Sequence, residues 1–162
     1  KIIILIITIV GLIGILALLG AVNTNKNDQL SGSSGPAVLS AVEDFFDFGT
    51  VSMAAGLVKH DFSVKNVAEK EITVTKVYTS CMCTEATLRM NGEKFGPFGM
   101  PGHGAVPRVN KKLGIGEEAV VEVVFDPAAH GPAGIGLIER VVFIENDSGQ
   151  PLELLIKAVI AP

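Results

Sequence analysis

Apolar and polar positions divide the chain into three stretches. Residues 1–22 are almost entirely apolar, and their only charge is a lysine at position 1. Residues 23–41 are rich in Asn, Ser and Gly and show no regular period. From residue 42 onward, short runs of Val, Ile, Thr and Phe alternate with Gly, Asn, Asp and Pro. No part of this last stretch has the helical period of about 3.6 residues, so we expect it to be all-β.

The first stretch is long enough to form a transmembrane helix. At about 1.5 Å per residue, residues 1–22 span the roughly 30 Å hydrocarbon layer of a bilayer. A cleaved signal peptide is the alternative, but its apolar part is normally only about 7 to 15 residues long. Lys1 places the N-terminus in the cytoplasm. We therefore expect a single-pass membrane anchor at residues 1–22, a flexible linker at residues 23–41 and an extracytoplasmic domain at residues 42–162.

The C-terminal domain is predicted to contain about seven strands, a number that suits a β-sandwich. In residues 71–77 apolar side chains recur at every second position before the pattern slips, as on a strand with one buried face. Turn-forming residues separate the runs. The predicted strands are residues 45–51, 57–66, 72–79, 84–90, 119–125, 137–145 and 152–160.

A long segment rich in Gly and Pro, residues 90–116, interrupts this pattern. We expect it to be an insertion without a strand of its own, and loops of this length in compact domains are usually functional or disordered. Phe95 and Phe98 flank a Gly-Pro pair within it. They either pin the loop onto the sheet, which we favour, or form an apolar contact for a partner together with Met100.

Several different short motifs lie along the domain, including a Ser-Cys-x-Cys-Thr signature at residues 80–84. These motifs resemble the bacterial domain of unknown function fifteen seventy-three. The resemblance implies an immunoglobulin-like sandwich of the Hydin-related type, exported and often tethered to a membrane, with no settled activity. Met82 stands where the family typically has Gly, and the insertion replaces a short connection. The matching motifs are residues 46–51, 60–66, 79–84, 125–127, 130–134 and 140–147.

Cys81 and Cys83 are the sharpest chemical feature of the chain. On an extended strand, residues two apart point to the same face about 6.6 Å from each other, which would place two thiols side by side. Soft sulfur ligands select Cu(I) and Zn, and the nearby Met100 and His103 enlarge the donor set. The structural alternative, two small buried side chains, carries equal weight. A redox pair ranks lower, because a disulfide across one residue would be strained.

Charge and motif content exclude several functions. The chain has 13 Lys and Arg against 17 Asp and Glu, and its net charge of -4 is the wrong sign for a nucleic-acid surface. Two cysteines are too few for a disulfide framework or a four-cysteine zinc site. The sequence contains no nucleophile elbow, phosphate-binding loop or zinc-protease motif, so we expect no enzyme. His60 and His130 are interpreted as structural.

Two functions from different classes remain, and both describe a domain that binds. In the first, Cys81 and Cys83 with Met100 or His103 hold a soft metal, Cu(I) above all, at the membrane surface. In the second, the domain is an interaction or assembly module of the cell envelope that holds no metal, with Phe95, Phe98 and Met100 as the contact. A thiol-redox protein is the third possibility.

Overall fold

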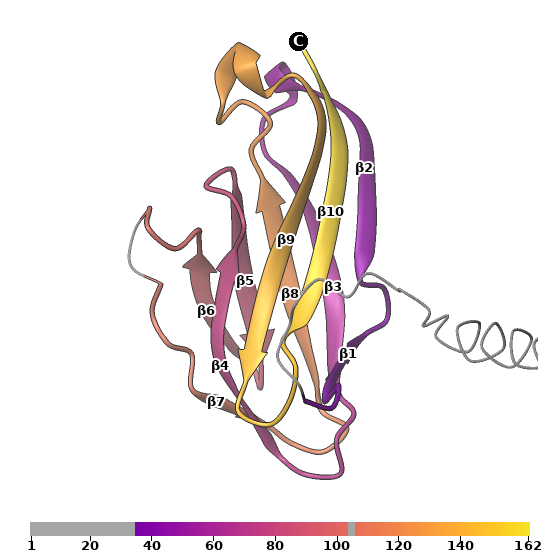
Figure 1. Cartoon of the computed structure of the whole chain (residues 1–162), viewed down its shortest axis with the longest axis vertical. Helices are drawn as coiled ribbons and strands as arrows, with labels where there is room; N and C mark the ends of the chain where they lie inside the picture. The colour runs from indigo at the N-terminus through magenta and orange to yellow at the C-terminus, as the bar shows by residue number, and fades with distance from the viewer. Residues whose placement is uncertain (1–34, 104–105) are drawn as a thin grey trace, which may run out of the picture. The chain divides into compact units, whose positions relative to one another are not determined.

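The computed structural model describes residues 35–103 and 106–162, which form a sandwich of two β-sheets (Figure 1). Each sheet contains five strands within the described ranges. The first sheet has the order β1 (Leu39–Ala41), β3 (Val58–Asn66), β8 (Glu118–Phe125), β5 (Thr84–Met90) and β6 (Glu93–Phe98). The second has the order β2 (Phe45–Ser52), β10 (Leu152–Ala161), β9 (Gly136–Asn146), β4 (Ile72–Thr79) and β7 (Lys111–Leu113). Short 3₁₀ turns lie at Met53–Ala55 and Gly131–Gly134.

The prediction of an all-β sandwich is confirmed, and every predicted strand is present within two residues of its expected ends. The prediction that residues 90–116 hold no strand is wrong. β6 pairs with β5 and β7 pairs with β4, and both lie at the edges of their sheets. A strand that contains Gly96 and Pro97 is compatible with an edge position, where no ladder hydrogen bond is needed from proline. β1 lies within the stretch expected to be linker and pairs with β3.

The strand order is that of an immunoglobulin-like sandwich. In the constant-type fold, strands A, B, E and D form one sheet, and strands C, F and G form the other. Here β1, β3, β8 and β5 occupy the first set of positions, and β4, β9 and β10 occupy the second. β2 adds a parallel partner to β10. The turns at the ends of such a sandwich bring together residues that are far apart in the sequence.

The core fills the space between the sheets and follows the alternation along the strands. In β4, Ile72 and Val74 are buried, and the buried position then shifts to Val77. The pairing of β4 with β9 changes register between Val74 and Lys76. The slip in the sequence pattern therefore marks an irregularity in the sheet. Fully buried side chains include Phe62, Leu88, Val121, Val123 and Phe125 from the first sheet and Val77, Ile144, Leu154 and Ile156 from the second.

No helix in the described ranges is both long and apolar enough to cross a bilayer. The expected membrane anchor, residues 1–22, lies outside the described residues, as does most of the expected linker.

Asn66, at the end of β3, ties two connections to the sheet from a position that is only 1% exposed. Its side-chain nitrogen lies 2.9 Å from the carbonyl oxygens of Lys70, Leu113 and Gly114, and its side-chain oxygen accepts from the Ala68 N–H. Asn66→Ala is expected to lower the free energy of unfolding by about 2 to 3 kcal/mol, because buried partners are left unsatisfied. Urea unfolding measures this loss. Gln150→Ala, an exposed amide, is the control, and equal stability of the two variants would contradict the prediction.

Candidate functional site

Cys81 and Cys83 lie in a tight turn between β4 and β5, not on an extended strand. The Thr84 N–H donates to the Cys81 carbonyl oxygen at 3.2 Å, which closes a four-residue turn. The prediction that the two cysteines lie on an extended strand, about 6.6 Å from each other, is therefore wrong. They lie 2.7 Å apart, and the Cys83 thiol donates to the Cys81 sulfur.

The turn is held by the side chains of the two residues that precede it, Thr79 and Ser80. The buried Thr79 hydroxyl lies 2.9 Å from the carbonyl oxygens of both Cys81 and Thr84. Ser80 is bonded to β9, since its N–H donates to the Val141 carbonyl and its hydroxyl oxygen accepts from the Val141 N–H, each at 2.9 Å. The cysteines are thus fixed by contacts with the second sheet.

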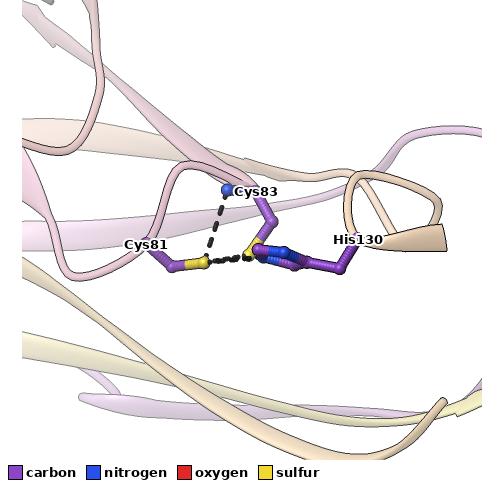
Figure 2. A group of neighbouring side chains, drawn as sticks. All are labelled: Cys81, Cys83 and His130. Carbon is purple, nitrogen blue, oxygen red and sulfur yellow. Dashed lines mark hydrogen bonds between the residues drawn. The ribbon is translucent and has the colours of Figure 1, made fainter. Parts of the chain in front are cut away.

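His130 reaches the cysteines from the loop between β8 and β9. The Asp126 N–H donates to the Cys83 carbonyl at 2.9 Å, which joins this loop to the cysteine turn. The Asp126 carboxylate accepts from the Ala128 N–H at 2.8 Å, and the Gly131 N–H donates to the Ala128 carbonyl at 2.9 Å. These bonds bend the loop so that His130 faces the cysteines (Figure 2).

The site combines two sulfur atoms, an imidazole and a guanidinium. His130 Nε2 lies 3.3 Å from Cys81 Sγ, and Arg140 Nε donates to Cys83 Sγ at 3.3 Å. The donor atoms of Cys81, Cys83 and His130 all lie within 4.8 Å of one another. Figure 2 shows the three side chains pointing toward a common centre. This is a geometry in which one ion can contact all three.

The two thiols differ in exposure and in acidity. Cys83 is buried, at 3% exposed, whereas Cys81 is half-buried and His130 is exposed. Burial opposes ionisation of Cys81, but hydrogen bonds from Cys83 and His130 and the charge of Arg140 outweigh it and lower the Cys81 pKa to about 7. Burial, together with the bond to Cys81, raises the pKa of Cys83. Cys81 is therefore the accessible and more acidic thiol.

Alkylation of Cys81 is expected to follow its thiolate and to reach half its maximal rate at about pH 7. Iodoacetamide time courses at a series of pH values, read by mass spectrometry, measure this midpoint. His130→Ala should move the midpoint upward, because the thiolate loses a hydrogen bond that favours it. His103→Ala should leave it unchanged. A midpoint near the ordinary thiol value of about 8.5 in the unmodified chain would contradict the prediction.

The remaining predicted site residues are not part of the group formed by Cys81, Cys83 and His130 in the described structure. In the described ranges His103 is not among the donors grouped with Cys81 and Cys83, and the His103 N–H closes a local turn on the Met100 carbonyl. Phe98 is 3% exposed and belongs to the core, so it offers no surface to a partner. Phe95 is half-buried against that core, with the Lys111 ammonium 5.0 Å from its ring centre. These two phenylalanines pin the segment onto the sheet, as we favoured.

Sequence reasoning missed His130 and Arg140. The sequence favoured His103, because it lies in the accessible Gly/Pro-rich segment, and His130 was interpreted as structural. The pairing of Thr84 with Phe125 brings the β8–β9 loop, and with it His130, to the site. A usable signal existed, because both residues lie in motifs that carried the family resemblance. His60 is structural, as expected, since its ring stacks on Phe46 and its Nε2 lies 2.7 Å from a Glu43 carboxylate oxygen.

Residues 39–96 match a family model described as a protein of unknown function (DUF1573). The match covers less than half of the chain. The DUF1573 match confirms the resemblance seen in the sequence and contains both cysteines. His130 and Arg140 lie beyond the matched segment. No curated protein matches the chain.

Several solved structures are similar in fold to this chain. A protein of unknown function from Porphyromonas gingivalis has a TM-score of 0.55 at 14% identity, over 83% of this chain and 51% of that one. A family 123 glycoside hydrolase from Clostridium perfringens has a TM-score of 0.50 at 4% identity, over 72% and 22%. The PapD-like domain 7 of human CEP192 has a TM-score of 0.47 at 10% identity, over 86% and 97%. The chain thus spans about half the length of the Porphyromonas protein. At these identities the likeness concerns the fold alone.

Proposed function

We propose that this domain binds a soft metal ion, Cu(I) above all, through Cys81, Cys83 and His130. One observation carries the proposal: the two sulfur atoms and the imidazole nitrogen lie within 4.8 Å of one another, on two loops that are bonded together. Thiolate sulfur selects Cu(I) and Zn, and imidazole is a ligand for both. His130 takes the place that we had assigned to Met100 or His103.

The number of ligands and the charge of the site favour Cu(I) over Zn. Structural zinc sites have four protein ligands, and three gather here in the described residues. Two thiolates around a monovalent ion leave one negative charge, and the Arg140 guanidinium at Cys83 neutralises it. A divalent ion would leave the half-buried Arg140 without a balancing charge, which is costly away from water.

The sequence before the domain suggests where this binding occurs. An apolar run at residues 1–22 and a polar linker would hold the domain outside the cytoplasm, close to a membrane. There the domain would sequester Cu(I) or pass it to another protein, and it would bind its ligand without transforming it. Its net charge of -4 argues against nucleic acid as a partner.

A protein-interaction module remains the second candidate. Its support is two exposed apolar residues, Met82 within the cysteine turn and Leu57, which are 51% and 67% exposed. Together with Cys83 they line a hollow of about 240 Å³. Contact with a partner here would use the cysteine end of the sandwich, not Phe98 in the core.

The test of metal binding is anaerobic loading of the full chain with Cu(I), followed by analysis of metal and free thiols. We expect one copper ion per chain and protection of both thiols from alkylation. A Cys81→Ser, Cys83→Ser double variant should retain no copper. The proposal fails if the unmodified chain retains no copper while both of its thiols react as in the metal-free protein.

A further inference from the structure

Cys81 and Cys83 differ in their exposure to solvent. Cys81 is half-buried and opens to solvent beside the exposed His130, whereas Cys83 is buried behind it. Attack on an external disulfide depends on access to the attacking sulfur. From this asymmetry we propose that the metal-free pair also exchanges thiols with a disulfide in another protein, with Cys81 as the attacking sulfur and Cys83 as the resolving sulfur.

The turn supplies the geometry for the resolving step. The two sulfur atoms already lie 2.7 Å apart, and hydrogen bonds from Thr79, Ser80 and Asp126 hold the turn. Once Cys81 is joined to a partner, Cys83 therefore lies next to the sulfur that it must attack. The turn has drawn together two sulfur atoms that an extended strand would hold further apart.

The exchange is balanced without any further reagent. The Cys81 sulfur attacks one sulfur of the partner disulfide, the partner S–S bond breaks, and a partner thiol leaves with the proton from Cys81. The Cys83 sulfur then attacks Cys81 in the mixed disulfide and releases the second partner thiol with the proton from Cys83. The dithiol is oxidised by two electrons to a Cys81–Cys83 disulfide, and the partner disulfide is reduced by the same two electrons.

The imidazole of His130 and the guanidinium of Arg140 lie beside the two sulfur atoms. His130 Nε2 is 3.3 Å from the attacking sulfur, and Arg140 Nε donates to the resolving sulfur at 3.3 Å. Negative charge develops on both sulfur atoms during exchange, and nearby donors stabilise it. Neither group has to move to make these contacts.

The surroundings of the pair favour a disulfide carried by a protein over a small polar one. On one side Leu57 and Met82 line a hollow with Cys83, and on the other Ile135 and Leu137 line a hollow of about 380 Å³ with His130 and Arg140. All four apolar side chains are between 47% and 67% exposed. An apolar peptide segment on either side of the partner disulfide would cover them.

The experiment compares two peptides on the full, copper-free chain, with a Cu(I) chelator present throughout. Both peptides contain one internal disulfide, and its flanking residues are leucine and valine in one peptide and serine and glycine in the other. Oxidised glutathione is the small-molecule probe. Mass spectrometry after acid quenching should show peptide dithiol and a chain lighter by two hydrogen atoms. The apolar peptide should react at least about tenfold faster than the polar peptide or glutathione, since access and fit control the rate.

The matched variants are Cys83→Ser and Cys81→Ser. Cys83→Ser should accumulate a mixed disulfide between Cys81 and the peptide, because no resolving sulfur is left. Cys81→Ser should react at least about tenfold more slowly, because its remaining thiol is buried. Equal rates for the two variants, or a chain that never forms the internal disulfide, would overturn the proposal. It does not rest on metal binding, since copper retention is measured separately and either result can fail alone.

Discussion

Cys81→Ser is expected to lower the affinity of the full chain for Cu(I) by at least about a hundredfold. Changing a residue that only orients a metal ligand typically lowers the metal affinity about 10- to 100-fold, and Cys81 is proposed as a ligand itself. Its sulfur is 2.7 Å from the second sulfur and 3.3 Å from the imidazole, so its loss leaves two donors of different kinds on separate loops. Competition with a chromophoric Cu(I) chelator measures the change in affinity.

Met82→Leu is the matched control for this prediction. Met82 lies between the two cysteines and is 51% exposed, and the change removes its sulfur while it nearly preserves side-chain volume. Its affinity for Cu(I) should equal that of the unmodified chain. If Cys81→Ser retains the unmodified affinity, or if Met82→Leu loses as much, copper is bound by other donors.

His130→Ala is expected to weaken Cu(I) binding by at least about tenfold, whereas His103→Ala should leave it unchanged. Comparing the two variants distinguishes a copper site that contains His130, as the structure suggests, from one that contains His103, as the sequence suggested. His130 is exposed and its imidazole makes no other side-chain hydrogen bond in the described residues, so its loss should not disturb the fold. The same chelator competition gives both affinities, and circular dichroism checks that each variant is folded.

A larger loss of Cu(I) affinity in His103→Ala than in His130→Ala would contradict the proposed site. If His103→Ala weakened binding and His130→Ala did not, the copper site would include the Gly/Pro-rich segment, as the sequence alone suggested. Equal small effects of both variants would point to binding by the two sulfur atoms alone.

Most strands could be predicted from the sequence, because apolar and polar residues alternate along a strand that buries one face. β4 shows this well, since even the slip in its pattern corresponds to a change of register against β9. β6 and β7 were missed for the opposite reason. Each lies at a sheet edge, where one neighbour is enough and where Gly96 and Pro97 are tolerated. The alternation of apolar and polar residues is therefore weaker in these edge strands than in the others.

The site was only half predictable from the sequence. The Cys-x-Cys spacing pointed to two adjacent sulfur atoms, but a two-residue spacing is compatible with either a strand or a turn. The Thr79 hydroxyl bonds that select the turn appear only in the folded chain. The histidine partner depended on long-range pairing, because β5 lies next to β8 and carries the cysteines to the β8–β9 loop. The sequence therefore favoured His103, which is not in the group that the described residues form around the two cysteines.

X-ray absorption at the copper edge of the full chain, loaded with one equivalent of Cu(I), identifies the atoms that surround the bound ion. We expect two sulfur neighbours and one nitrogen neighbour around a single copper ion, with the nitrogen lost in His130→Ala and kept in His103→Ala. A copper ion surrounded by sulfur alone, or one whose nitrogen neighbour survives His130→Ala, would contradict a site built from Cys81, Cys83 and His130.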